Sequence, residues 1–98
     1  MYRVMVDDNF HFMDERERYI EGDFDTLEAA HDACRKIVEY SLKDLFKPGV
    51  TAETLYSNYK CFGEDPFVRV PPGELRSAFS AWDYAKQRAS EMCADPST

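Results

Sequence analysis

The fold is decided by the stretch DTLEAAHDACRKIVEYSLKDL, residues 25–45 of the 98-residue chain. Its apolar residues recur at steps of three, four and one, the spacing of one helix face. Asp25 can cap the helix start, with Glu28 three residues later as in a capping box. Lys47-Pro48-Gly49 ends the helix, because proline removes a backbone donor and disfavours helix in the preceding residue. The apolar face consists of Leu27, Ala30, Cys34, Ile37, Val38, Leu42 and Leu45.

Two strands are expected before this helix. Val4 and Val6 alternate with more polar or larger neighbours, as in a half-buried strand. A second strand runs from about Arg16 to Asp23, centred on Tyr19 and Ile20. The residues between them would close a hairpin.

Two shorter helices and one strand are expected after it. Thr51 caps the first helix, and Gly63 ends it in the left-handed conformation. Phe67–Val70 is a short strand, Pro71-Pro72-Gly73 breaks the chain, and Ser80 caps the last helix. The predicted apolar faces are Leu55, Tyr56, Tyr59 and Phe62 in the first helix, and Trp82, Ala85, Ala89 and Met92 or Cys93 in the last.

The order β-β-α-α-β-α predicts an α+β fold, with a small antiparallel sheet and helices packed on one face. The length allows one core without metal or disulfide staples. We therefore expect a single domain over residues 1–93 and a flexible tail over residues 94–98.

Composition excludes several functional classes. Twelve basic against 19 acidic residues give a net charge of −7, and the basic residues are scattered, which argues against direct nucleic-acid binding. No apolar stretch approaches the length of a membrane span, and the N-terminus lacks the apolar stretch of a secretory signal. The three cysteines are widely spaced without a C-x-x-C, so we expect reduced thiols and a cytoplasmic protein.

Phosphate-binding and serine-hydrolase motifs are also missing. The four glycines stand at least ten residues apart, whereas dinucleotide and P-loop motifs need glycines close together. There is no G-x-S-x-G. No cofactor is predicted.

Four segments carry a resemblance that covers nearly the whole chain. They are Val6–His11 (VDDNFH), Gly22–Thr26 (GDFDT), Phe62–Phe67 (FGEDPF) and Phe79–Ala85 (FSAWDYA). In these the sequence resembles a group of small uncharacterised bacterial proteins. The resemblance implies a bacterial cytosolic α+β domain and carries over no catalytic residues.

The strongest candidate for a binding surface is the acidic hairpin at the N-terminus. Residues 1–25 contain eight acidic and three basic residues, which is −5 of the total charge. Exposed apolar groups rimmed by charge are a common arrangement for binding a partner. The alternative is that the side chains of Phe10 and Phe12 pack into the core while the acidic side chains are solvated. The candidate residues are Asp8, Phe10, His11, Phe12, Met13, Asp14, Glu15 and Glu17.

Metal and thiol chemistry have weaker signals. Asp7, Asp8, His11, Asp14 and Glu15 offer oxygen and imidazole ligands, but their spacing fits no EF-hand, and no metal is predicted. His31 lies on the apolar face of the long helix and is expected to be a packing residue. Cys34 lies mid-helix on that face, where a reactive thiolate is disfavoured.

A second candidate is a groove lined by aromatic side chains, Tyr56, Tyr59, Trp82 and Tyr84, which could hold a small ligand or a peptide. The alternative is an ordinary core wall. Two functions stay open. The favoured one is a non-enzymatic interaction or regulatory domain that binds a basic protein partner or itself. The other is a small-molecule binder or hydrolytic enzyme that uses a carboxylate and histidine cluster.

Overall fold

Three strands form one antiparallel sheet in the order β2-β1-β3. The computed structural model describes residues 1–8, 18–75 and 79–94. The strands are β1 (Tyr2–Asp8), β2 (Tyr19–Phe24) and β3 (Glu64–Arg69), and the helices are α1 (Leu27–Leu45), α2 (Ala52–Phe62) and α3 (Ala81–Met92). The α+β class and the order β-β-α-α-β-α are as predicted.

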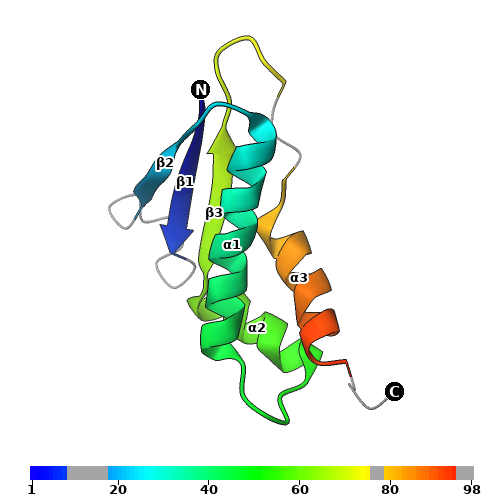
Figure 1. Ribbon diagram of the computed structural model, residues 1–98. Helices are drawn as coiled ribbons and strands as arrows, with labels where there is room; N and C mark the ends of the chain where they lie inside the picture. Colours follow the sequence, from blue (N-terminus) through cyan, green and yellow to red (C-terminus); the bar gives the residue numbers. More distant parts are fainter. Residues whose placement is uncertain (9–17, 76–78, 95–98) are drawn as a thin grey trace.

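Helix α1 lies along one face of the sheet, α2 crosses at one end, and α3 packs beside α1 away from β2 (Figure 1). The strand pattern explains the contact with α1, because Val4 and Val6 are fully buried on the face that meets Ala30 and Cys34. On β3, Val68 pairs with Val4 and completes this cluster. Both outer strands, β2 and β3, leave one edge unpaired within the described sheet.

A second cluster joins the three helices. It contains Val38 and Leu42 of α1, Leu55 and Tyr59 of α2, and three alanines of α3. Ala81, Ala85 and Ala89 are spaced by four residues, so α3 presents a stripe of small side chains that permits close packing. Trp82 was expected on this inner face, but it lies beside the stripe and is 36% exposed.

The N-terminal cap of α1 differs from the prediction. The cap is Thr26 rather than Asp25, and its hydroxyl accepts a hydrogen bond from the Ala29 amide at 3.1 Å. Glu28 consequently lies one position too early for a capping box with this residue. The caps predicted for the other two helices, Thr51 and Ser80, are both present.

Gly63 ends α2 as predicted, but not in the left-handed conformation. Its φ of −82° and ψ of 178° are accessible to any residue. Glycine fits here because there is no room for a side chain. A Cβ atom at this position would lie 2.4 Å from the Tyr59 ring and 2.9 Å from the Tyr59 carbonyl oxygen. The chain turns closely over Tyr59 at this point and enters β3 immediately afterwards.

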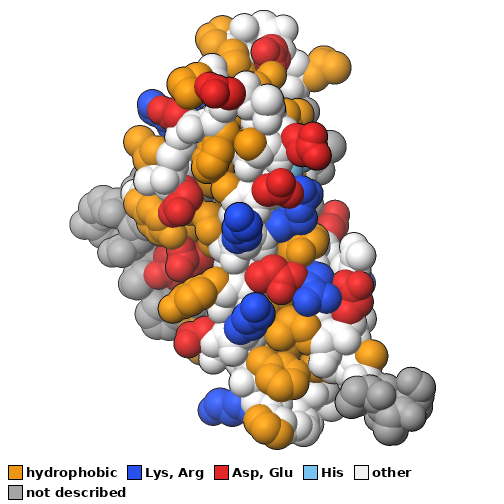
Figure 2. Space-filling model, in the orientation of Figure 1, with side chains coloured by type: hydrophobic (Ala, Val, Ile, Leu, Met, Phe, Trp, Pro, Cys, Tyr) orange, Lys and Arg blue, Asp and Glu red, His pale blue; other side chains and the backbone are white. Residues whose placement is uncertain are grey.

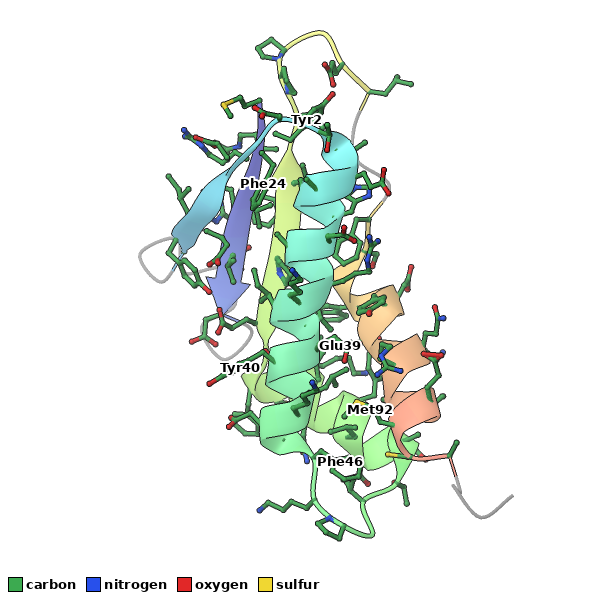
Figure 3. All side chains as sticks on the ribbon, viewed as in Figure 1. Tyr2, Phe24, Glu39, Tyr40, Phe46 and Met92 are labelled. Atoms are coloured by element: carbon green, nitrogen blue, oxygen red, sulfur yellow. The ribbon has the colours of Figure 1, made fainter. Side chains whose placement is uncertain are left out.

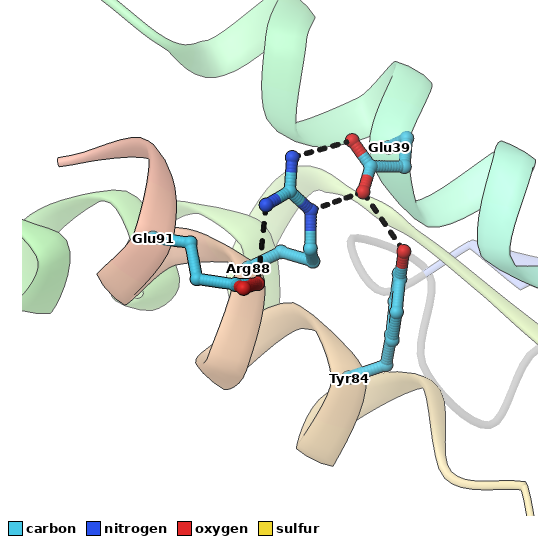
Figure 4. Close-up of polar contacts among 4 residues, drawn as sticks. All are labelled: Glu39, Tyr84, Arg88 and Glu91. Atoms are coloured by element: carbon cyan, nitrogen blue, oxygen red, sulfur yellow. Dashed lines mark hydrogen bonds and ion pairs between the residues drawn. The ribbon is translucent and has the colours of Figure 1, made fainter. Parts of the chain in front are cut away.

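A polar tie joins α1 to α3 (Figure 4). Glu39 of α1 accepts hydrogen bonds from the Tyr84 hydroxyl at 2.8 Å and from both Nε and Nη2 of Arg88, the latter at 3.3 Å. Arg88 also pairs with Glu91 at 3.1 Å. Arg88 and then Tyr84 hold the pKa of the Glu39 carboxyl below its ordinary value, although partial burial opposes this.

Candidate functional site

Most of the predicted hairpin site lies outside the described residues. The predicted site residues outside the described ranges are Phe10, His11, Phe12, Met13, Asp14, Glu15 and Glu17. The predicted tail is likewise outside them, except for Ala94. Asp8 is the last residue of β1 and is partly buried. Strands β1 and β2 pair in the antiparallel direction, as a hairpin requires.

Acidic residues face each other where β1 ends and β3 begins. Asp7 is opposite Asp65, and Asp8 is opposite Glu64, in the antiparallel register. Like charges directly opposite each other on neighbouring strands are destabilising. We call these four residues the acidic end of the sheet. The sequence does not indicate the acidic end, because Glu64 and Asp65 follow a helix and are separated from β1 by more than fifty positions.

Two of these carboxylates have partners on β2 or just before it. The Arg18 guanidinium binds Asp7 through Nε at 2.6 Å and Nη2 at 3.2 Å, a bidentate arrangement. The Tyr19 hydroxyl donates a hydrogen bond to Glu64. Burial, then Glu64, raises the pKa of that hydroxyl. Asp7 is therefore paired with a cation, whereas Glu64 accepts its hydrogen bond from a neutral hydroxyl.

Asp65 is the exception within this group. It is partly buried, and its carboxylate has neither a hydrogen bond nor an ion pair with any described residue. Burial raises its pKa to about 6, and the charge of Asp7 contributes in the same direction. A partly buried carboxylate without a partner is costly to the fold, so its presence needs an explanation beyond packing.

A groove runs between the edge strand β2 and helix α1. It has a volume of about 520 Å³, with Phe24, Ala33, Ile37 and Tyr40 among its lining residues. Figure 2 shows apolar side chains gathered between β2 and α1, with basic and acidic side chains interleaved along the helix. In Figure 3, Phe24 lies between β2 and α1, and Tyr40 extends from α1 toward the same side. Because both Lys36 and acidic residues line the groove, it favours neither a cationic nor an anionic ligand.

A second hollow, of about 440 Å³, lies where the start of β3 meets α2 and the first turn of α3. We call it the aromatic–acid pocket. Four aromatic rings and two carboxylates line it, together with Pro66, Ser80 and Ala81. The six are Tyr56, Asp65, Phe67, Phe79, Trp82 and Asp83.

Of the four aromatic residues predicted to line a groove, two line the aromatic–acid pocket and two do not. Tyr56 and Trp82 lie in the aromatic–acid pocket. Tyr59 is instead fully buried in the core, and its hydroxyl donates to the Glu64 carbonyl at 2.6 Å. Tyr84 belongs to the tie with Glu39. The helical spacing identified the two pocket aromatics, but the contributions of Phe67 and Phe79 depend on packing between distant segments.

The histidine and cysteine of α1 behave as packing residues. The His31 ring lies 5.6 Å from the Phe79 ring, and His31 lines neither hollow described above. Cys34 is fully buried, and burial raises the pKa of its thiol to about 12, which disfavours a nucleophilic thiolate. No group of three or more potential ligand residues within the described ranges is arranged to hold a metal ion.

Comparisons with family models, curated proteins and solved structures found no match for this chain. The described helices include none that is long and apolar enough to cross a membrane.

Proposed function

We propose that this protein is a non-enzymatic protein-interaction domain that binds a basic partner at the acidic end of its sheet. The observation that carries the proposal is the cross-strand pairing of Asp7 with Asp65 and of Asp8 with Glu64. This arrangement opposes folding, and a cationic partner would remove the repulsion. In the sequence, the same charge continues into the connection between β1 and β2, which holds Asp14, Glu15 and Glu17.

Other features support an interaction domain over an enzyme. Neither of the two hollows described above has His31 among its lining residues. A carboxylate and histidine cluster would have favoured the alternative, a small hydrolytic enzyme or a metabolite binder. The described cysteines are all free, which suits a reducing compartment such as the cytoplasm.

The test compares capture of partners by two charge variants. The first is Asp8→Asn with Glu64→Gln, which neutralises two of the four carboxylates of the acidic end and changes no residue that lines the aromatic–acid pocket. The matched control is Asp44→Asn with Glu53→Gln, two exposed acids on α1 and α2. Wild type and both variants are immobilised, incubated with bacterial lysate, and the captured proteins are identified by mass spectrometry.

We expect basic proteins to be captured by wild type and control but lost with the acidic-end variant. For a captured protein in purified form, the association rate should fall several-fold in the acidic-end variant, and the salt dependence should flatten. Equal capture by both variants, or partners that are themselves acidic, would overturn the proposal.

A further inference from the structure

The aromatic–acid pocket has the composition of a site for an organic cation. Its lining residues include two carboxylates and no lysine or arginine. The carboxylate of Asp83, like that of Asp65, has neither a hydrogen bond nor an ion pair with any described residue. Asp83 and Tyr56 both line the pocket. Burial, and then the charge of Asp83, raises the pKa of the Tyr56 hydroxyl. A ligand with N–H donors and a positive charge would satisfy both acids.

The aromatic walls select the kind of cation. Mg²⁺ and Ca²⁺ take six or more oxygen ligands, so beside these two carboxylates they would need several waters, for which aromatic walls are poor surroundings. Aromatic faces attract ammonium and guanidinium groups instead. Two rings of this pocket already lie next to cations, since Arg18 is 5.2 Å from the Phe67 ring centre and Lys60 is 4.7 Å from that of Tyr56. Trp82, whose ring type binds cations best, is partly exposed here.

We propose that the aromatic–acid pocket binds a lysine side chain of the basic partner, with its ammonium group between Asp65 and Asp83 and its methylenes against the aromatic rings. The inference rests on the proposed function and adds the chemical group that is recognised. The two carboxylates come from different elements, β3 and α3. A compact ammonium has three donors in a tetrahedral arrangement that can reach both carboxylates from a narrow pocket. A guanidinium can also serve two carboxylates, as Arg88 does with Glu39 and Glu91, but it is larger and needs both acids close to its own plane.

Trp82 allows a direct test because it is the only tryptophan in the chain. The full-length protein is titrated with N-acetyl-lysine methylamide while Trp82 fluorescence and amide NMR shifts are followed. The norleucine analogue, which keeps most of the stem and lacks the charge, and the arginine analogue serve as competitors. We expect saturable binding of the lysine compound, and at least about tenfold weaker binding of the norleucine and arginine analogues.

Variants then locate the site. Asp65→Asn and Asp83→Asn should each weaken lysine binding by about tenfold, whereas the matched surface variant Asp44→Asn should change it less than about twofold. Loss of binding in Asp65→Asn cannot be attributed to unfolding if thermal melts show this variant at least as stable as wild type. The inference is overturned if norleucine or arginine binds as well as lysine, or if Asp44→Asn weakens binding as much as Asp65→Asn.

The two proposals can fail separately. If lysine does not bind but Asp8→Asn with Glu64→Gln still abolishes partner capture, the pocket inference is wrong and the interaction function stands. If lysine binds in the pocket but the same double variant captures partners like wild type, the acidic end is not the partner site.

Discussion

Replacing Asp65 with asparagine should stabilise the protein at neutral pH. The folded-state pKa of about 6 exceeds the ordinary value of 3.8, so the folded state favours the protonated acid. Stability therefore falls as pH rises through this window and remains lower above it. Because the carboxyl is still partly exposed, we expect Asp65→Asn to gain about 1 kcal/mol rather than the full equivalent of the shift.

Urea unfolding at neutral pH and near pH 4 measures this difference. The gain should become much smaller at the lower pH, where the wild-type acid is protonated in the folded state and partly protonated in the unfolded state. Asp44→Asn serves as control and should show little change at either pH. A gain that is equal at both pH values would mean that the carboxylate is not desolvated as the structure indicates. The sequence could not reveal Asp65, because its burial results from segments that are distant along the chain.

At the scale of elements, local patterns predicted most of the fold. The apolar spacing of α1, the caps Thr51 and Ser80, and the alternation in β1 all act within a few residues, so a sequence shows them directly. Strand β3 begins earlier than predicted, at Glu64, although acids and proline are unfavourable in strands. Pairing with β1 outweighs that local preference, and this tertiary effect also creates the acidic end.

Helix α3 should depend on its tie to α1. Arg88→Met keeps the length of the side chain but removes the ion pair with Glu39, and we expect it to lower the unfolding free energy by about 1–2 kcal/mol at neutral pH. The Glu39 pKa is lowered in the fold, so the contribution is present above its unfolded value and declines as pH falls below that value. The effect of Arg88→Met should therefore diminish in acid.

The control for this variant is Arg35→Met. Arg35 forms an exposed pair with Asp32 within α1, and its removal should cost below about 0.5 kcal/mol. Chemical denaturation at several pH values gives both differences. A similar loss in the two variants would show that the Glu39–Arg88 pair is no stronger than an ordinary surface ion pair.

For the whole molecule, the edge of β2 that no described strand pairs with and the net charge of −7 have opposite effects on self-association. Ile20 on this strand is 53% exposed and Tyr19 is 43% exposed, so two copies could pair edge to edge and bury apolar surface. Repulsion between two equally charged copies opposes this contact at low salt.

Salt should therefore separate self-association from binding of a basic partner. Screening at roughly 0.5 M salt shortens the Debye length to a few ångströms, which weakens attraction to a cationic partner and also weakens repulsion between copies. In sedimentation velocity we expect a monomer at low salt and a concentration-dependent dimer at high salt. Ile20→Lys should remain monomeric in both conditions, because it places a charge at the centre of the apolar contact. A dimer that weakens as salt is added, or one that Ile20→Lys leaves intact, would show that copies associate through another surface.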